Sequence, residues 1–492
     1  MAAVQAISRP FGTLGALVRA HALEAPRRIA LSHGGRRVSY AELDVSMDRI
    51  AAALRRDGIG AGERIALCGV NSIEYALLFL GALRAGVVCA LVPPGVTGAA
   101  RAAMVADANA RQFFDDARLA ALGDWMGTPG AVLEEPDIRP GSAFNIIYSS
   151  GTTGAPKGIV QPHSMRWAHM QRGPTYHYDG DSVTLLATPL YSNTTLVSFF
   201  PTLAMGGTVL MMGKFDAAAY LALAQAERAT HTMLVPVQYQ RIMALPGFDA
   251  HDLSSFRMKL STSAPFPAAL KRDVIGRWPG ELVEYYGMTE GGATCVLWCN
   301  RHPDKLDTVG RPAAGVEVRL VDEEGREVPQ GHAGEVVGHS GAMMTGYHNR
   351  PADTAEAEWF DGAGRRYIRT GDIGRFDEDG FLTLVGRRKD MIISGGFNVY
   401  PSDIEAVLRA HEAVLDATVV GMPSQRWGES PVAFVVAKAG TAPSTLLDWA
   451  NQRLGKVQRL AALELVAELP RSAIGKVLKR ELREAWQGRL QL

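Results

Sequence analysis

The first half of the chain alternates between segments with helical and with strand-like apolar patterns, and this alternation constrains the fold more than any other feature. Ser39–Arg56 has apolar residues at steps of four, three and four, which predicts a helix. Arg64–Cys68 has the pattern of a short strand, and Ser72–Arg84 that of a second helix. Further segments of these two kinds are Val87–Val92, Ser182–Ala187, Thr208–Met212, Ala217–Ala229, Thr232–Val235 and Met258–Ser261. Strands that alternate with helices predict parallel sheets built from βαβ units.

The later part of the chain has a different character. Val316–Val321 and Glu335–His339 have strand-like patterns around a turn, and Arg375–Gly386 predicts a hairpin. This part is therefore β-rich and lacks the βαβ alternation. Shorter segments of both kinds follow: Pro401–Ala410, Ala417–Val420, Pro431–Ala437, Ser444–Leu454 and Ala473–Trp486.

These patterns predict an α/β fold with two domains. We expect residues 1–386 to form a large N-terminal domain of βαβ-type sheets with a β-rich subdomain. A hinge at 387–390 then leads to a small α+β C-terminal domain over 391–492.

Charge and hydropathy exclude two classes of partner. The 51 basic and 51 acidic residues give a net charge of zero, whereas a protein that binds nucleic acid usually carries a basic excess. The longest apolar stretch, Tyr75–Val92, is interrupted by Arg84 and falls short of the about 18–20 uncharged residues that a membrane span needs. We therefore expect no nucleic-acid partner and no integral membrane association. The N-terminus lacks the pattern of a secretory signal, and an amphipathic transit peptide stays open as an alternative.

The four cysteines do not suggest a disulfide framework or a metal site. Cys68, Cys89, Cys295 and Cys299 are few for a chain of 492 residues, which favours a reducing compartment, and we expect the cytoplasm. Cys295 and Cys299 lie near His302, but a zinc site needs at least one more ligand at suitable spacing. We therefore expect two small, partly buried residues there.

The segment most informative about chemistry is a glycine-rich loop that follows the apolar strand Asn145–Tyr148. The loop, Ser149–Gly158, combines glycines with Ser and Thr hydroxyls and Lys157. Such a loop can turn its backbone amides toward an anion and place one cation beside it, which predicts a phosphate site. It lacks the spacing of a Walker A loop. A flexible surface turn is the alternative interpretation.

Two further segments carry groups that suit a nucleotide. Within Glu284–Glu290, an aromatic ring for a base, a hydroxyl for a phosphate and a carboxylate for Mg²⁺ lie close together. In Tyr367–Asp372, an acid beside a glycine at a predicted strand end can accept both hydroxyls of a ribose. Gly386–Gly396 and Pro470–Lys476 are the remaining polar motifs. Taken separately, each segment could be a turn, an ion pair or a solvated face.

Together and in this order, the five motifs resemble the adenylate-forming superfamily, which includes acyl-CoA synthetases, adenylation domains of peptide synthetases, and luciferases. The resemblance covers nearly the whole chain. It implies that the protein uses ATP, Mg²⁺ and CoA. It also implies that a carboxylic acid first forms an acyl-adenylate with release of pyrophosphate, after which a thiol takes the acyl group and AMP leaves.

The resemblance also implies roles for individual residues around ATP. The phosphate loop, with Lys157 as an auxiliary cation, would fold over the β- and γ-phosphates. Thr289 would contact the α-phosphate, and Glu290 would hold Mg²⁺. Residues matching the family's ATP site are Ser149, Ser150, Gly151, Thr152, Thr153, Gly154, Lys157, Ser263, Ala264, Pro265, Tyr286, Gly287, Asp372 and Arg387. In this set, Tyr286 would stack on adenine and Asp372 would bind the ribose.

A mobile C-terminal domain is the next implication. Lys476 would reach the region between the carboxylate and the α-phosphate, so that Lys476, Thr289 and Glu290 form the expected catalytic set. Lys389 matches the family's hinge position. Rotation about it would withdraw Lys476 and bring the CoA-binding segment toward the pantetheine tunnel. That segment is Ser394, Gly395 and Gly396.

The expected acyl pocket departs from the family pattern. Its predicted residues are Tyr191, Ser192, Asn193, Gly291 and Gly292. Ser192 stands where acyl- and aryl-CoA synthetases commonly carry His, so a gating role for that position is not carried over. Asn193 replaces the Asp that pairs with an amino-acid ammonium group, and Tyr285 replaces the Arg of malonyl-CoA synthetases.

We therefore expect an apolar monocarboxylic acid, which would place the protein in fatty-acid or aromatic-acid metabolism. The segment after Asn193 is apolar, with a plain core helix as the alternative interpretation. Only sixteen residues follow Lys476, so CoA is the expected acceptor and the expected partners are small molecules, with a monomer or homodimer. The alternatives are a stand-alone ligase that loads a carrier protein, a catalytically silent ATP- or acyl-binding homologue, and light emission of the firefly type.

Overall fold

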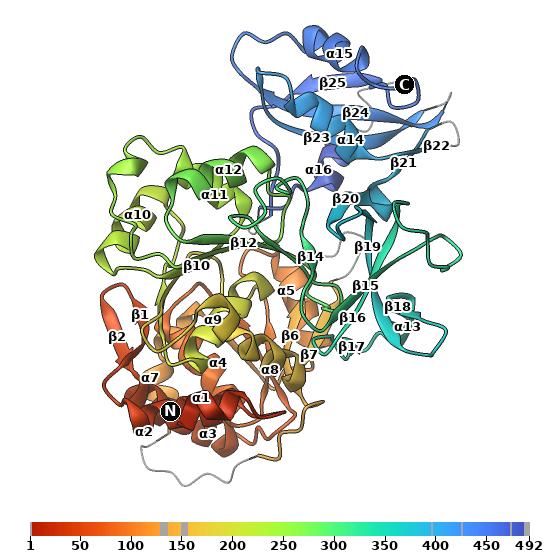
Figure 1. The fold of residues 1–492 in the computed structure, drawn as a ribbon. Helices are drawn as coiled ribbons and strands as arrows, with labels where there is room; N and C mark the ends of the chain where they lie inside the picture. Colours follow the sequence, from red (N-terminus) through yellow and green to blue (C-terminus); the bar gives the residue numbers. More distant parts are fainter. Residues whose placement is uncertain are drawn as a thin grey trace. The chain divides into compact units, whose positions relative to one another are not determined.

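The structure is a computed structural model that describes residues 2–127, 136–148, 156–394, 397–424, 427–472 and 475–486. The side chains of residues 2–4 and 398 are outside this description. The chain divides into two compact units (Figure 1). The first unit comprises Met1–Asp307, Pro312–Glu317 and Gly338–Ile368, and the second comprises Thr308–Arg311, Val318–Val337 and Arg369–Leu492.

One sheet has the strand order β14-β13-β12-β11-β10-β8-β9-β1-β2 (Figure 1). Its strands are β1 Ile29–His33, β2 Arg36–Ser39, β8 Val183–Leu186, β9 Thr208–Met211, β10 His231–Leu234, β11 Met258–Ser261, β12 Glu281–Tyr286, β13 Cys295–Trp298 and β14 Arg311–Pro312. The strands from β1 through β9, β8, β10, β11 to β12 pair in parallel. The carboxyl ends of β11 and β12 therefore lie next to each other at one edge of this sheet.

A second sheet of the first unit has the order β17-β7-β6-β4-β3-β5. Its strands are β3 Arg64–Cys68, β4 Val88–Leu91, β5 Gln112–Asp115, β6 Ala143–Tyr148, β7 Gly158–Pro162 and β17 Gly346–Tyr347. The pairs β5–β3, β3–β4 and β4–β6 are parallel, and β6–β7 and β7–β17 are antiparallel. The predicted α/β fold with parallel sheets is therefore confirmed.

Helices connect and cover these strands. They are α1 Ala2–Ile7, α2 Leu14–Glu24, α3 Tyr40–Arg56, α4 Ile73–Arg84, α5 Gly98–Asp107, α6 Asp116–Ala120, α7 Leu122–Trp125, α8 His163–Gln171, α9 Asn193–Ala204, α10 Ala217–Ala226, α11 Pro236–Met243, α12 Ala268–Arg277 and α13 Pro351–Glu356, with short 3₁₀ helices η1 Gly173–Tyr176 and η2 Phe248–Ala250. Helix α4 packs against β4 of one sheet and β1 of the other, α8 against β6 and β7, and α9 against β8 and β9. Because these helices touch strands of both sheets, one continuous apolar core joins the two sheets.

The N-terminal caps explain where two of these helices begin. Ser39 accepts a hydrogen bond from the backbone N–H of Glu42, and Glu42 accepts one from the backbone of Ser39, which forms a capping box before α3. Ser72 accepts from the backbone N–H of Tyr75 before α4. The predicted helices Ser39–Arg56 and Ser72–Arg84 are confirmed, with the first serine of each acting as the cap.

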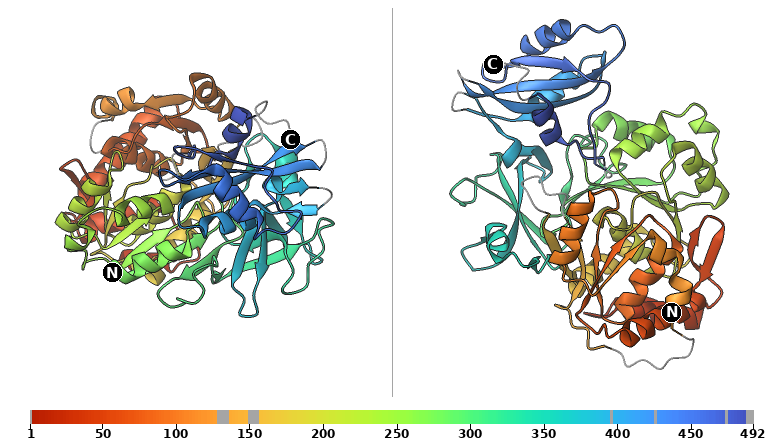
Figure 2. Two further views of the ribbon diagram at one scale, coloured as in Figure 1. Left: turned by 90° about the horizontal axis from the view of Figure 1, so that it is seen from above. Right: turned by 180° about the vertical axis from the view of Figure 1, so that it is seen from behind.

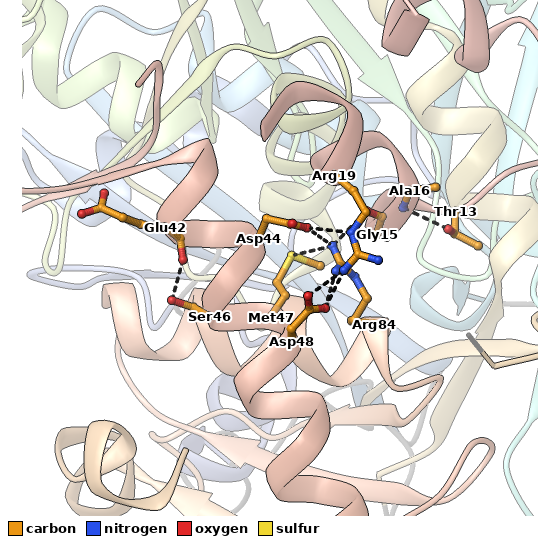
Figure 3. A network of polar contacts seen from close by, with 10 residues as sticks. All are labelled: Thr13, Gly15, Ala16, Arg19, Glu42, Asp44, Ser46, Met47, Asp48 and Arg84. Atoms are coloured by element: carbon orange, nitrogen blue, oxygen red, sulfur yellow. Dashed lines mark hydrogen bonds and ion pairs between the residues drawn. The ribbon is translucent and has the colours of Figure 1, made fainter. Parts of the chain in front are cut away.

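A network of ion pairs ties α2, α3 and α4 together (Figure 3). The guanidinium of Arg84, 9% exposed, lies 2.6 Å from both Asp44 and Asp48. Arg19 lies 2.7 Å from Asp48, and Arg84 also donates to the carbonyl of Gly15 at 3.0 Å. Figure 3 shows Arg84 reaching from α4 to the two carboxylates on α3. A buried cation with two carboxylate partners fixes the relative positions of these helices.

A third sheet follows the order β15-β16-β19-β18, and β20 pairs with β19. Its strands are β15 Val316–Val321, β16 Gly334–Ser340, β18 Glu358–Phe360, β19 Arg366–Phe376 and β20 Leu382–Arg387. β19 and β20 form the predicted antiparallel hairpin. The expectation that Asp372 lies at a strand end is wrong, because β19 continues to Phe376. Gly371 adopts a φ of +70°, and a register shift after Ile373 absorbs this irregularity within the strand.

The C-terminal part of the second unit is a small α+β layer. Its elements are η3 Arg388–Asp390, β21 Ile392–Ser394, β22 Phe397–Val399, α14 Pro401–Arg409, β23 Val414–Ser424, β24 Gly428–Ala437, α15 Pro443–Asn451, β25 Ala462–Leu465 and α16 Lys479–Trp486 (Figure 2). Alternate residues of β23 and β24 bury two opposite faces. One face packs with α14 and α15, and the other with Leu482 of α16. The predicted α+β character is confirmed.

In the ranges that the structure describes, no helix combines the length and the apolar character needed to cross a bilayer.

Candidate active site

The predicted phosphate loop joins two paired strands. Residues Ser149, Ser150, Gly151, Thr152, Thr153 and Gly154 of this prediction lie outside the described residues. β6 ends at Tyr148, which is paired with Gly158 at the start of β7. The loop therefore connects neighbouring antiparallel strands. At its end, the ammonium of Lys157 lies 2.5 Å from a carboxylate oxygen of Asp353 and 5.2 Å from the ring centroid of Tyr347.

Glu290, the predicted Mg²⁺ ligand, lies beyond the end of β12 and is held by Tyr347. The Tyr347 phenol donates a hydrogen bond of 2.8 Å to Oε1 of Glu290. Burial, and next the Glu290 charge, raise the pKa of this phenol, so it remains a donor at neutral pH. The Glu290 backbone carbonyl accepts from the amide of Met344 at 2.7 Å. Tyr347 and Asp353 were not found from the sequence, because neither lies in a motif that suggested chemistry.

The predicted adenine-site residues follow neighbouring strands. Ser263, Ala264 and Pro265 come after β11, and Tyr286 ends β12, which is adjacent and parallel. Tyr286 is 8% exposed. Ser263 adopts a φ of +83°, and its hydroxyl lies 2.5 Å from that of Thr194. Gly287 is exposed, and Thr289 is partly buried. The carboxyl ends of the parallel strands therefore bring these residues to one sheet edge.

Gly291 and Gly292 lie where the backbone passes very close to another strand. Their φ values are +76° and +83°. A Cβ on Gly291 would lie 2.0 Å from the carbonyl oxygen of Ala342, and one on Gly292 would lie 2.5 Å from that of Gly338. Only glycine fits this approach. The two glycines therefore fix the path of the chain after Glu290, whereas their predicted place in an acyl pocket stays a proposal.

The predicted acid-binding residues lie at the start of α9. Tyr191 is partly buried against the core, Ser192 is 8% exposed, and Asn193 is the first residue of the helix. Oδ1 of Asn193 accepts a hydrogen bond of 3.3 Å from the Gln161 amide. Farther along α9, Leu196, Phe199 and Phe200 are fully buried. These three residues belong to the core, while Val197, Tyr285 and Val296 keep partial exposure.

The second unit contains the predicted catalytic residue Lys476 and the predicted ATP-binding residues Asp372 and Arg387. Asp372 of β19 pairs with Arg387 of β20, and its Oδ1 lies 3.0 Å from Nε of Arg387. Lys476 follows Gly475, whose φ is +76°, and its backbone carbonyl accepts a hydrogen bond of 2.8 Å from the amide of Ser472. Burial, together with Arg387 and Lys389, lowers the pKa of Lys476 to about 8, against the opposite effect of Asp372.

The hinge and CoA predictions also fall in the second unit. Lys389 lies in η3, and burial followed by Arg387 lowers its pKa. Ser394 ends β21 and is 6% exposed. Gly395 and Gly396 lie outside the described residues. The domain limits at 387–390 stay a prediction.

The donor set suits a single divalent cation bound by one carboxylate. Among the described residues, no three His, Cys, Asp or Glu side chains form a group that could hold a metal by themselves. Mg²⁺ in nucleotide sites is commonly held by one or two carboxylates together with phosphate oxygens. The Glu290 carboxylate, oriented by Tyr347, fits that mode. Cys295 and Cys299 are free thiols and fully buried, whereas the sequence suggested partly buried residues.

Comparison with known proteins agrees with this arrangement. Residues 18–348 match the family model described as AMP-binding enzyme, and residues 403–476 match the AMP-binding enzyme C-terminal domain. Similar relatives include a feruloyl-CoA synthase of an Amycolatopsis species, 34% identical over 93% of this chain and 96% of that protein. A fatty acid–[acyl-carrier-protein] ligase of Streptomyces coeruleorubidus is 32% identical over 95% of each chain.

Among solved structures, ATP-bound MatB from Rhodopseudomonas palustris is similar, with a TM-score of 0.86 and 29% identity over 97% of this chain and 99% of that chain. The two family models together cover most of the sequence. The chain therefore belongs to the AMP-binding enzymes, the adenylate-forming superfamily, and is an AMP-forming ligase.

Proposed function

We propose that the protein is an ATP-dependent carboxylic acid–CoA ligase. It would activate the acid as an acyl-adenylate with release of pyrophosphate, and then transfer the acyl group to CoA with release of AMP. The observation that carries the proposal is the cluster around Lys476 in the second unit. There a lysine with a lowered pKa stands near Asp372 and Arg387, the residues that match the family's ribose contacts.

Charge explains what these residues would do. A carboxylate and a triphosphate repel each other, so catalysis requires alignment of the two groups and neutralisation of their charge. Lys476 would hold its proton and place an ammonium group beside the reacting carboxylate and α-phosphate. Thr289 would orient the α-phosphate. Glu290 would hold Mg²⁺, which when bound neutralises phosphate charge.

The acid is proposed to be an apolar monocarboxylic acid. The residues matching the family's pocket carry no charge: Asn193 is a neutral amide, and Tyr285 is a phenol whose pKa is raised by burial. A second carboxylate or an ammonium group, buried in the pocket with the substrate's side chain, would have no opposite charge among them. The relatives named for ferulate and fatty acids activate acids of this general kind.

The test is a panel of acids with ATP, Mg²⁺ and CoA, scored by both AMP release and thioester yield. Aromatic and aliphatic monoacids should give both products in equal amounts. Preference for an amino acid or a dicarboxylate would overturn the interpretation of Asn193 and Tyr285. A parallel panel with a holo acyl-carrier protein in place of CoA distinguishes the acceptor. AMP release with thioester on the carrier protein alone would make the protein a carrier-loading ligase.

A variant separates the two half-reactions. Lys476→Ala should abolish pyrophosphate exchange and leave thioester formation from a supplied acyl-adenylate largely intact, because the second step does not need the ammonium at the α-phosphate. Equal loss of both steps would remove Lys476 from the proposed role. Absence of pyrophosphate exchange in the unmodified protein with every acid would refute the ligase proposal for these substrates.

A further inference from the structure

A fully buried polar cluster lies inside the core of the first unit, close to the candidate site. Arg166 of α8, Asn145 of β6 and Gln161 of β7 are each 0% exposed. Nε of Arg166 donates to Oδ1 of Asn145 at 3.2 Å, and Nη2 donates to Oε1 of Gln161. Nδ2 of Asn145 donates to the same Gln161 oxygen at 3.0 Å. The Arg166 guanidinium thus donates hydrogen bonds to two side-chain amide oxygens.

The far side of Gln161 reaches two segments of the candidate site. Its Nε2 donates to the backbone carbonyl of Thr289 at 2.7 Å and to Oδ1 of Asn193 at 3.3 Å. Thr289 matches the family's α-phosphate contact, and Asn193 starts the helix of the predicted acid pocket. The Gln161 side chain therefore connects these two segments through one amide group.

Arg166 determines which way this amide points. A guanidinium has only donors, and a backbone carbonyl has only an acceptor. The Gln161 oxygen must therefore face Arg166, and its nitrogen must face Thr289 and Asn193. If the amide turned over, its oxygen would face the acceptor oxygens of Thr289 and Asn193, and its N–H groups would face Arg166. The side-chain hydrogen bonds of Gln161 to Arg166, Thr289 and Asn193 would then be lost.

The cost of burying this charge argues against a purely structural role. Arg166 has no carboxylate partner among the described residues, and its Nη1 has no hydrogen-bond partner there. It lies 5.6 Å from the ring centroid of Phe200 and 6.0 Å from that of Phe144. Burial lowers its pKa to about 9, so it is still charged near neutral pH. Apolar side chains of similar volume commonly stabilise a core as well as a buried charge does.

We propose that Arg166 is a positioning residue, which fixes the Gln161 amide and through it the relative positions of Thr289 and Asn193. The proposal rests on the proposed function, because it assigns Thr289 to the nucleotide and Asn193 to the acid. The cluster would keep the segment that orients the α-phosphate at a fixed position relative to the segment that receives the carboxylic acid. In-line attack of the carboxylate on the α-phosphorus depends on this relative position.

Two variants test the proposal in the full-length protein. Arg166→Met removes the donors and keeps an apolar side chain of similar length. Gln161→Glu keeps an acceptor facing Arg166 but leaves no N–H for Thr289 or Asn193. Each should lower kcat for pyrophosphate exchange by about 10- to 100-fold and raise KM for the acid. Gln161→Glu gives Arg166 an ionic partner but sets an oxygen against the Thr289 carbonyl, so its Tm is measured together with its rate.

Lys259→Met is the matched control. Lys259 is also a fully buried basic side chain, and burial lowers its pKa to about 7. It donates to the backbone carbonyls of Trp278, Pro279 and Gly280 and to no predicted site residue. Its removal should lower Tm and leave kcat nearly unchanged. Arg166→Lys, which keeps a charge and a donor, should recover part of the rate that Arg166→Met loses.

The outcomes separate this proposal from the proposed function. If the unmodified protein exchanges pyrophosphate and Gln161→Glu does so with the same kcat and acid KM, the positioning role is refuted and the ligase stands. If Arg166→Met and Lys259→Met lose Tm and activity in the same proportion, Arg166 is structural only. If the unmodified protein shows no exchange with any acid, it is the proposed function that fails.

Discussion

The lowered pKa of Lys476 predicts an unusual pH dependence of adenylation. Burial, with the charges of Arg387 and Lys389, brings the pKa of its ammonium to about 8 from an ordinary 10.5. The proposed role needs the protonated form, so activity should be lost as the pH rises through this value. Because one pH unit changes the ratio of the two forms tenfold, about one tenth of Lys476 is protonated one unit above its pKa.

The assay is pyrophosphate exchange followed from about pH 6 to about pH 10. kcat/KM for ATP reports the free enzyme and should fall about tenfold per unit above pH 8. In the bound complex the triphosphate favours the ammonium form, so the fall in kcat should move to higher pH. An ordinary lysine would show no fall before about pH 10.

Two variants test whether Lys476 causes this loss of activity at high pH, the basic limb of the pH profile. Lys476→Arg keeps its charge throughout the range, so its residual activity should show no fall near pH 8. Lys389→Met removes a charge that opposes protonation of Lys476 and should shift the limb to higher pH. The reasoning is refuted if Lys476→Arg keeps the same basic limb, or if the unmodified protein stays fully active up to pH 10.

Three further predictions concern single residues. Arg84→Ala removes two short charge-assisted hydrogen bonds and leaves Asp44 and Asp48 with the more exposed Arg19, so it should lower the free energy of unfolding by about 3 kcal/mol. Arg36→Ala, at an exposed pair, should change it by less than about 1 kcal/mol, and equal losses in urea unfolding would contradict this. Tyr347→Phe removes the hydrogen bond to Glu290 and should raise the Mg²⁺ concentration needed for half-maximal exchange by about tenfold, and an unchanged Mg²⁺ titration would count against it. Lys389→Pro should slow thioester formation more than pyrophosphate exchange, and the opposite ranking would argue against a hinge at this position.

Local signals predicted much of the fold. The strand Arg64–Cys68 has the predicted limits, because an apolar run between polar residues is enough to define a buried strand. The helix expected at Ser39–Arg56 starts where its serine can cap it. Asp372 was misplaced because Gly371 suggests a strand end, whereas pairing with β20 carries the strand past the glycine. The pairing of Asp372 with Arg387 lies outside the predicted hairpin Arg375–Gly386, and the residues around Gly371 give no local sign of it.

The candidate site shows the same limit. Motifs of consecutive polar residues, such as Thr289 and Glu290, could be assigned from the sequence because the family pattern is continuous there. Gln161 and Arg166 could not be assigned from the sequence. A polar residue next to an apolar one occurs both on protein surfaces and in cores, so the sequence does not show that these two are buried. Only the fold shows that β7 and α8 turn these side chains into the interior. Contacts between distant segments therefore have to come from the structure.

The burial of every cysteine has a practical consequence for work with this protein. Cys68, Cys89, Cys295 and Cys299 are all free and at most 2% exposed, and burial raises the pKa of each thiol, that of Cys299 to about 12. Thiols that are shielded and un-ionised react slowly with electrophiles. A chromogenic disulfide reagent added to the folded enzyme should therefore titrate the sulfhydryl of the added acceptor almost alone, which permits continuous colorimetric recording without a protein background.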